Sequence, residues 1–314
     1  MTKTKIVIDC DPGHDDAVAI LYAARHMDLL GVTTCHGNNS IENVTRNALS
    51  VLTLAGLDIP VAQGCGEPIA GPRIQPANAH GKTGLDGTDL PEPDRAPIGQ
   101  HAVDFLIDTA SAHRGELVLG IIGPSSNVAL AMKKEPRFAS WLREITIMGG
   151  STGLGNITPL AEFNVWADAE AAAVVFASGV PIRMAGYNVT SRTGTNAEEI
   201  ERLLAGPRVA RHIGELLRFY RMRQQQFFGL DIAPMHDVCA MVPYVREGLI
   251  TYRHCHVDVE LSGRLTRGMT VCDLRTLTEE GKAARGSGVP NALVAIETEA
   301  RALIGHVVDT MLTF

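Results

Sequence analysis

The sequence has little that would take the protein to a membrane or to nucleic acid. No apolar run approaches the ~20 residues that span a bilayer, and the chain begins MTKTKIVID, which is too short and too soon charged for a signal peptide. The formal net charge of −7 leaves no basic footprint for nucleic acid or anionic lipid. We therefore expect a cytoplasmic protein without membrane or nucleic-acid partners, whose ligands are small and neutral or cationic.

Paired cysteines and interdomain linkers are also missing from the sequence. The six cysteines stand singly with no CxxC spacing, so neither a zinc site nor a disulfide framework is indicated in a chain of this size. We expect reduced, mostly buried thiols. Because there is no low-complexity linker and no repeat of fixed period, the 314 residues are interpreted as one domain, 1–314.

The sequence does contain a regular alternation of strand-like and helix-like segments. Runs rich in Val and Ile, such as KIVID, LVLGIIG and EITIMGG, are separated by helical patterns. This order predicts an α/β, Rossmann-like fold in which a mostly parallel sheet is covered by helices on both faces. Helices are expected at 15–26, 41–55, from 126 onward, and at 168–178, 196–205, 207–227 and 292–312.

Two further segments complete this expectation. CHVDVELSG and RGMTVCDL are expected to pair as strands at the edge of the sheet. Gly and Pro cluster between residues 64 and 99, which predicts a long loop, and loops of that length are usually functional or mobile.

An acidic cluster follows the first predicted strand, in DCDPGHDD. Ligands of open α/β sheets bind beyond the carboxyl ends of the strands, which favours a functional role here. Asp15 and Asp16 fall in the first turn of a helix, where one or two of these residues can act as caps. Asp9 and Asp11, however, alternate onto one face of the strand, and the Pro-Gly turn brings the later pair back towards them.

Charge repulsion decides what such a cluster requires. Like charges ~4 Å apart repel by about 4 kcal/mol at an effective dielectric constant of 20, so three converging carboxylates would carry roughly 12 kcal/mol. That sum rivals the ~5–15 kcal/mol stability of a whole domain. Converging side chains therefore need a cation or a shared proton, and a flexible, carboxylate-rich cage suits Ca²⁺ better than Mg²⁺. The spacing matches neither an EF-hand nor a P-loop.

Polar residues also follow other predicted strands. Asn38 ends the second strand, and Asn156, Glu162 and Asn164 stand in the loop GLGNITPLAEFN, a mixture of donors and acceptors suited to a polyhydroxyl ligand such as a sugar. The turn GPSSN, residues 123–127, closes another strand, and its carbonyl groups would face the same crevice.

Late in the chain, Asp237 in APMHDVCAMV is either a distant metal ligand or the N-cap of a helix. His80 and His236 are candidates for proton transfer because an unperturbed pKa near 6.5 suits that task, although a typical histidine is an ordinary surface or core residue. The stretch FYRMRQQQFFGLD is read first as an amphipathic core helix.

Four motifs occur in order: DCDPGHDD, GPSSN, IMGG followed by GNITPLAEFN, and PMHD. Together they resemble the inosine–uridine preferring nucleoside hydrolases over nearly the whole chain. The resemblance implies a Rossmann-like fold, a bound Ca²⁺, hydrolysis of the bond between ribose C1′ and a nucleobase, and assembly into homodimers or homotetramers.

The resemblance also implies roles for individual residues. The calcium ligands would be Asp11, Asp16, the backbone carbonyl of Ser126 and Asp237, and Asp11 would also be the general base that takes a proton from a water held by the ion. His236 would be the catalytic residue beside the base, and Asp9 would orient the ligands. The residues implied to contact the substrate are Asp15, Asn38, His80, Met148, Asn156, Glu162, Phe163, Asn164, Gln224 and Phe228.

Within this family, His14 and the string GLGNITP resemble the pyrimidine-preferring members, which implies uridine or cytidine as substrate, with inosine as a further candidate. Two departures stand out. Phe228 occupies a position where a tyrosine is frequent, which puts a proton relay through that hydroxyl in doubt. Ser126 replaces a more usual threonine, which matters little if its carbonyl alone binds.

Two alternative functions compete with hydrolysis of nucleosides. A phosphatase of the haloacid dehalogenase type would use Asp9 as nucleophile, but Gly13 stands where that motif needs Thr or Val. A non-catalytic ribose- or nucleoside-binding protein would keep the calcium site without chemistry, and turnover of uridine would exclude it.

Overall fold

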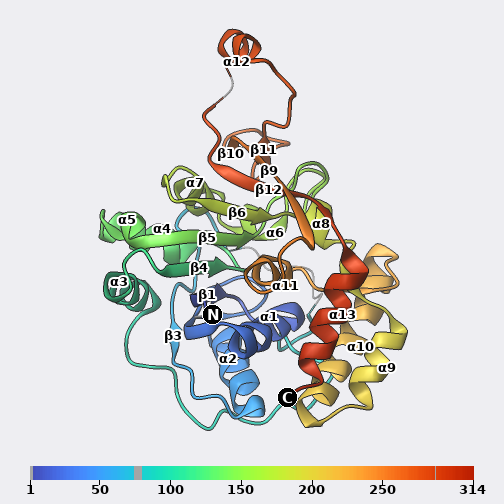
Figure 1. Ribbon diagram of the computed structural model, residues 1–314. Coiled ribbons are helices and arrows are strands. Elements are labelled where there is room, and N and C mark those ends of the chain that lie inside the picture. Colours follow the sequence, from blue (N-terminus) through green and yellow to red (C-terminus); the bar gives the residue numbers. More distant parts are fainter. Residues whose placement is uncertain (1–2, 74–79, 287) are drawn as a thin grey trace.

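An eight-stranded sheet lies at the centre of the structure, a computed structural model that describes residues 3–73, 80–286 and 288–314 (Figure 1). The strand order is β3-β2-β1-β4-β5-β6-β12-β9, in which β9 alone runs antiparallel to its neighbour. The strands are β1 (Lys5–Cys10), β2 (Asp28–Thr34), β3 (Val61–Gln63), β4 (Leu117–Ile121), β5 (Leu142–Met148), β6 (Ile182–Ala185), β9 (Ile250–Cys255) and β12 (Ala292–Thr298). The mostly parallel α/β architecture expected from the sequence is confirmed.

The sheet is buried on both faces because successive apolar side chains of its strands enter two different cores. Ile6 and Ile8 of β1 belong to one apolar cluster, while Val7 between them belongs to the other. Such strands read as nearly continuous apolar runs, since side chains alternate between two buried faces.

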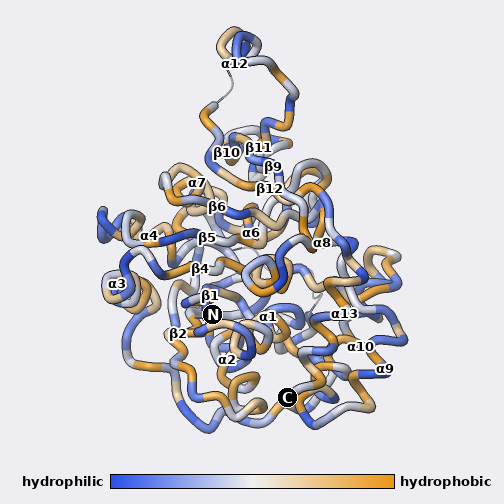
Figure 2. The backbone as a smooth tube through the Cα atoms, in the orientation of Figure 1, coloured by the Kyte–Doolittle hydropathy of each residue, from blue (hydrophilic) through white to orange (hydrophobic). Residues whose placement is uncertain are grey.

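Helices cover both faces (Figure 1). One face carries α3 (Ala102–Ala112), α4 (Ser126–Lys134), α5 (Phe138–Trp141) and α7 (Ala169–Phe176). The other carries α1 (His14–His26), α2 (Ile41–Ala55), α9 (Ala197–Leu204), α10 (Arg208–Phe228), α11 (Val238–Met241) and α13 (Ala300–Met311). Hydrophilic and hydrophobic segments alternate along α9 and α10 in Figure 2, which is typical of helices with one face on a core.

Short elements surround these layers. They are α6 (Phe163–Ala167), α8 (Tyr187–Thr190), α12 (Glu279–Arg285), the 3-10 helix η1 (Val242–Tyr244), and two small sheets, β7 (Gly194–Thr195) with β8 (Ala233–Pro234) and β10 (Val257–Val259) with β11 (Thr270–Cys272). The segment with α12 projects away from the body of the molecule (Figure 1). Among the described residues, no helix combines the length and apolar character needed to cross a bilayer.

Most expected elements match the structure, and two differ. The segment 292–312 is not one helix, because Ala292–Thr298 forms β12 between β6 and β9 and the helix begins at Ala300. A strand buried on both sides has continuous apolar residues, so periodicity does not separate it from a helix. The expected strand pair exists as β10 and β11, but it forms a sheet of its own instead of the edge of the central sheet.

The expected long loop is present: residues 64–73 and 80–97 contain neither helix nor strand, and residues 74–79 lie outside the described part. The cysteines are free, and Cys10, Cys35, Cys239 and Cys255 are buried.

Candidate active site

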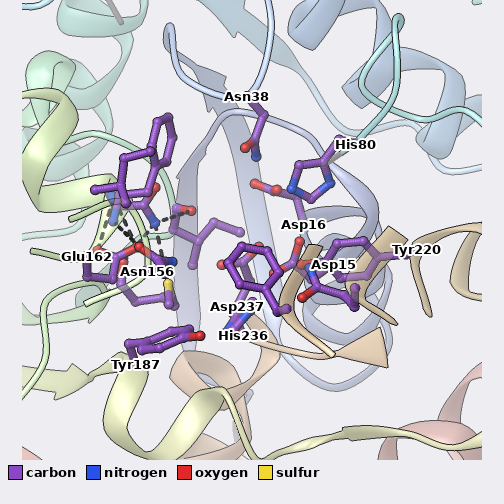
Figure 3. A pocket seen from close by; sticks show the side chains of 17 residues that line it. Asp15, Asp16, Asn38, His80, Asn156, Glu162, Tyr187, Tyr220, His236 and Asp237 are labelled. Atoms are coloured by element: carbon purple, nitrogen blue, oxygen red, sulfur yellow. Dashed lines mark hydrogen bonds between the residues drawn. The ribbon is translucent and has the colours of Figure 1, made fainter. Parts of the chain in front are cut away.

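A cavity opens where the strand order reverses between β1 and β4, beyond the carboxyl ends of these strands (Figure 3). This is the position at which open α/β sheets bind ligands, because the two neighbouring connections run to opposite faces. The space within the cavity and its open mouth is about 820 Å³. Of the residues predicted for the site, it is lined by Asp15, Asp16, Asn38, His80, Met148, Asn156, Glu162, Phe163, Asn164, Gln224, Phe228, His236 and Asp237.

Three buried carboxylates converge at one side of the cavity. Oxygen atoms of Asp15, Asp16 and Asp237 all lie within 4.8 Å of one another. Two of the three stand in the first turn of α1, and Asp237 directly precedes α11. Three like charges at this separation repel by about 3–4 kcal/mol per pair at an effective dielectric constant of 20. The group therefore requires a cation or bound protons.

The acidity of these carboxyl groups reflects the same crowding. Burial, followed by the charge of Asp16, raises the pKa of Asp15 to about 8. Burial raises the pKa of Asp16 to about 6, and it raises the pKa of Asp237 well above its usual value, with the charges of Asp15 and Asp16 adding to the effect. A divalent cation would reverse these shifts because it favours the ionised form.

Asp11 lies beside this group but is neither part of it nor a lining residue of the described cavity. Its Oδ2 accepts the backbone N–H of Asn38 at 2.7 Å, whereas its Oδ1 is buried without a hydrogen-bond partner. The carboxylate is tightly enclosed, since a Cβ atom built on Gly37 would lie 1.9 Å from Oδ2 and one on Gly123 would lie 2.7 Å from Oδ1. Burial, then the charge of Asp16, raises the pKa of Asp11 well above its usual value.

The oxygen atoms at this place fit a hard divalent cation. All the donors are carboxylates, and the unpartnered Oδ1 of Asp11 is a buried acceptor that lacks a counterpart in the protein. Ser126, the other predicted ligand, is fully buried at the start of α4, outside the lining of the described cavity. Its hydroxyl donates to Asp168 Oδ2 at 2.6 Å and contacts His36 Nε2 at 2.8 Å.

Asp9 is held away from the cavity. Its Oδ1 accepts from Thr33 Oγ1 at 2.5 Å and from Asn127 Nδ2 at 2.8 Å, and the residue is fully buried. A nucleophile must reach its substrate, so this position argues against the phosphatase alternative.

Three amide side chains on another side of the cavity are oriented by their protein contacts. Asn164 Nδ2 donates to the carbonyl groups of Ile122 and Met148, both at 3.1 Å, which turns its Oδ1 to the cavity as an acceptor. Asn156 has the opposite arrangement, because its Oδ1 accepts the backbone N–H of Phe163 at 2.8 Å and its Nδ2 remains as a donor. The cavity thus presents both hydrogen-bonding senses, as a ribose with several hydroxyl groups requires.

Asn38 and Glu162 complete this side. Asn38 Nδ2 donates to the Asp11 carbonyl at 3.2 Å, which leaves Oδ1 as an acceptor. Glu162 is the N-cap of α6, where its carboxylate accepts the backbone N–H groups of Asn164, Val165 and Gly150. Burial nevertheless raises the pKa of Glu162 to about 7.

His80 contacts His14 in an aromatic stack on the other side of the cavity. The two Nδ1 atoms lie 3.0 Å apart, His14 Nε2 lies 2.8 Å from the Asp86 carbonyl, and His14 also stacks on Tyr220. Burial lowers the pKa of His14 to about 4 and that of His80 well below its usual value. The long loop therefore contributes a neutral imidazole to the site.

His236 precedes Asp237 of the converging carboxylates and contacts α8. Its Nδ1 lies 2.8 Å from Thr190 Oγ1, and its ring stacks on Tyr187 with centroids 5.8 Å apart. Burial lowers the pKa of His236 to about 4.

The helix α10 supplies one wall of the cavity through Tyr220, Gln224 and Phe228, which are spaced by four residues and share one face. Phe228 is 47% exposed at the end of this helix. The stretch first read as a core helix thus has a face on the ligand cavity as well as on the core.

Four lining residues were missed from the sequence: Ile122, Ile157, Tyr187 and Tyr220. The positions of two of these residues in the sequence could have indicated them. Tyr187 follows the carboxyl end of β6, as the other candidates follow their strands, and Tyr220 stands four residues before Gln224.

Comparison with known proteins agrees with this site. Residues 6–304 match the family described as inosine-uridine preferring nucleoside hydrolase. The chain is 40% identical over 276 residues to the pyrimidine-specific ribonucleoside hydrolase RihB of Shigella sonnei, covering 87% of this chain and 88% of that protein.

Two solved structures are similar throughout. The plant nucleoside hydrolase PpNRh1 matches with a TM-score of 0.90 and 30% identity, covering 99% of this chain and 100% of that one. The purine-preferring ribonucleoside hydrolase from Gardnerella vaginalis matches with a TM-score of 0.90 and 28% identity, covering 98% of each chain.

The matches over nearly the whole chain place this sheet and its acidic, amide-lined cavity in the class of enzymes that split N-glycosidic bonds. The chain belongs to the inosine-uridine preferring nucleoside hydrolase family, and it is a nucleoside hydrolase.

Proposed function

We propose that this enzyme is a calcium-dependent ribonucleoside hydrolase that prefers pyrimidine nucleosides such as uridine and cytidine. The observation that carries the proposal is the cavity itself, which joins three converging carboxylates to oriented amides and to two histidines. The base preference is supported by the pyrimidine-specific relative at 40% identity. Inosine remains a candidate substrate, because a purine-preferring enzyme has the same fold.

The proposed ligands of Ca²⁺ are Asp11, Asp16, Asp237 and the backbone carbonyl of Ser126. Asp15 lies in the same converging group of carboxylates. Its proposed role is to accept a hydrogen bond from a ribose hydroxyl. When bound, the cation would lower the pKa of a water molecule and neutralise the carboxylates. The unpartnered Oδ1 of Asp11 supports its assignment as a ligand.

In the proposed reaction, Asp11 accepts a proton from the attacking water, whose oxygen forms a bond to ribose C1′. The bond from C1′ to the base breaks, and its electron pair leaves with the base. Asn38, Asn156, Glu162 and Asn164 bind the ribose hydroxyl groups and stabilise the sugar as it gains oxocarbenium character. Met148 lies beneath the sugar.

His80, His236, Gln224, Phe228 and Phe163 surround the base in this proposal. His236 is the residue proposed to stabilise the departing base. The neutral imidazoles expected at these positions suit a polar but uncharged ligand such as uracil.

The proposal is tested by incubating the purified protein with uridine, cytidine, inosine and adenosine and measuring the reducing sugar released. We expect the two pyrimidine nucleosides to have the highest kcat/KM. Removal of divalent cations by a chelator should abolish turnover, and added Ca²⁺ should restore it. Release of ribose from none of the four nucleosides, or unchanged turnover after exhaustive chelation, would contradict the proposal.

Other expectations remain proposals: a single domain spanning 1–314, a location in the cytoplasm, and homodimers or homotetramers. Light scattering on the purified protein would measure the assembly directly.

A further inference from the structure

The helix α8 contacts His236 at two points. Thr190 Oγ1 lies 2.8 Å from Nδ1 of the imidazole, and the ring of Tyr187, one turn earlier, stacks on it at 5.8 Å with an angle of 28° between the planes. Figure 3 shows Tyr187 and His236 next to each other at the wall of the cavity. Two residues of the four-residue helix α8 therefore fix both the plane of the imidazole and its rotation.

The direction of the hydrogen bond follows from the surroundings of Thr190. This residue is fully buried, and within the described part of the chain the partner found for its hydroxyl is His236 Nδ1. If Nδ1 were the donor, the hydroxyl hydrogen would be buried without an acceptor, which is unfavourable. With Thr190 as donor, its buried hydroxyl hydrogen has His236 Nδ1 as acceptor. A neutral imidazole then carries its hydrogen on Nε2.

The Nε2 edge is the part of the ring available to a ligand. His236 lines the cavity and is partly exposed, while Nδ1 is turned to α8. Because Nδ1 accepts the hydroxyl hydrogen of Thr190, the N–H group of a neutral ring lies on this edge.

We propose that Thr190 is a positioning residue that holds His236 in the tautomer protonated at Nε2, so that the neutral ring donates a hydrogen bond to the departing base. The inference rests on the proposed function, because it assumes that His236 faces the base. It deepens that function by assigning His236 as a hydrogen-bond donor instead of a proton source.

Cleavage of the bond between ribose and base needs no proton from His236. The bond between C1′ and the base nitrogen breaks, its electron pair remains on the base, and the base leaves as an anion that accepts the Nε2–H hydrogen bond. The proton of the attacking water passes to Asp11, and the base anion takes a proton from solvent afterwards. A donor fixed before the charge develops stabilises the transition state more than the ground state.

The test compares uridine with 4-nitrophenyl β-D-ribofuranoside, whose leaving group is an anion that is already well stabilised. In the Ca²⁺-loaded enzyme, Thr190→Val should lower kcat for uridine about tenfold, part of the roughly 10²–10³-fold contribution of one such donor. KM should stay within about twofold. Turnover of the nitrophenyl riboside should also change by less than about twofold, and Thr190→Ser should restore uridine turnover because it keeps the hydroxyl.

Thr193→Val is the matched control. Thr193 is also fully buried and follows the same short helix, but its hydroxyl donates to the Val189 carbonyl at 3.0 Å and does not contact His236. This variant should leave both substrates unchanged. In a His236→Ala background, Thr190→Val should have no further effect on uridine turnover, as expected for a residue that acts through the histidine.

Nitrogen NMR of histidine-labelled enzyme gives an independent readout. Nδ1 of His236 should show the shift of a bare nitrogen, and Thr190→Val should move it towards a mixture of tautomers. A protonated Nδ1 in the unmodified enzyme would overturn the inference, as would equal losses on both substrates in Thr190→Val. If His236→Ala itself fails to lose uridine turnover selectively, the base-side assignment in the proposed function is wrong and the inference falls with it. If His236→Ala is selective and Thr190→Val is not, the inference alone is wrong.

Discussion

The two halves of the cavity are built from different lengths of chain. In the acidic half, Asp15 and Asp16 stand in the first turn of α1, and one distant residue, Asp237, joins them. Asp11 lies beside this group, a few residues earlier in the chain. The half assigned to the base combines residues from a long loop, from α8, from α10 and from the segment before α11. Charge dominates the first half, whereas neutral rings and an amide dominate the second.

We propose that this difference separates the chemistry from the choice of substrate. A group of carboxylates that must share a cation tolerates little change, because the loss of one ligand alters the charge of the whole group. Rings on separate elements can change one at a time. A pyrimidine-specific and a purine-preferring relative are both similar to this chain over most of its length.

The largest effect is expected from Asp11→Ala, which should lower ribose release from every nucleoside by at least about 10⁴-fold, because it removes both the proposed base and a proposed ligand. Initial rates with uridine and inosine measure the loss, and calorimetric titration with Ca²⁺ measures the affinity. A variant that retains turnover would show that the acidic half does not perform the chemistry.

In the other half, His236→Ala should lower uridine turnover by roughly 10²–10³-fold, the contribution of one donor to a developing negative charge. The loss should differ between uridine and inosine, because the bases carry their leaving charge at different places. Ca²⁺ affinity should change little. An identical loss for both nucleosides would break the proposed division between the halves.

The stability of the chelated enzyme should depend on pH through the buried carboxyl groups of the cavity. The pKa values of Asp15, about 8, and Glu162, about 7, lie above the ordinary values of 3.8 and 4.5, so the folded state binds more protons than the unfolded state. The free energy of unfolding should therefore decrease as pH rises from 6.5 to 8, by on the order of 1 kcal/mol or more. The buried histidines have lowered pKa values and act in the opposite direction. Through them, the free energy of unfolding should decrease as pH falls below about 6.5.

Urea unfolding in a chelator measures this slope. Ca²⁺ should remove the pH dependence of the free energy of unfolding because the cation holds the carboxylates ionised. Without Ca²⁺, Asp15→Asn should make this pH dependence smaller. A slope of the opposite sign above pH 6.5 would show that the carboxyl groups are ionised in the folded, chelated protein.

The smallest effect is expected from Phe228→Tyr at the mouth of the cavity. Because this side chain is 47% exposed, a new hydroxyl should change the ratio of kcat/KM for uridine and inosine by about two- to tenfold, the range of one hydrogen bond. Phe227→Tyr is the control, since Phe227 is equally exposed but does not line the cavity.

The early part of the acidic half, Asp15 and Asp16, could be predicted from the sequence because these residues are close in the chain and their repulsion demands an explanation. Asp237 is distant in the chain, and the family resemblance was needed to assign it to the same group. All ten residues that the family resemblance implied as substrate contacts line the cavity. The strand-end rule alone pointed to some of them, such as Asn38 and Asn164. Tyr187 and Thr190 were harder to find, because their importance comes from contact with a histidine 46 residues or more along the chain. Segment 292–312 was misread because an apolar run has the same composition in a buried strand and in a helix.

The placement of β12 between β6 and β9 has a consequence for biosynthesis. As the polypeptide leaves the ribosome, β6 and β9 are complete before the strand that joins them exists. A nascent chain must therefore keep the edge of β6 unpaired, where it is open to pairing with other chains. Protection of that edge, by a chaperone or by a compact intermediate, would be needed until residues 292–298 have been translated.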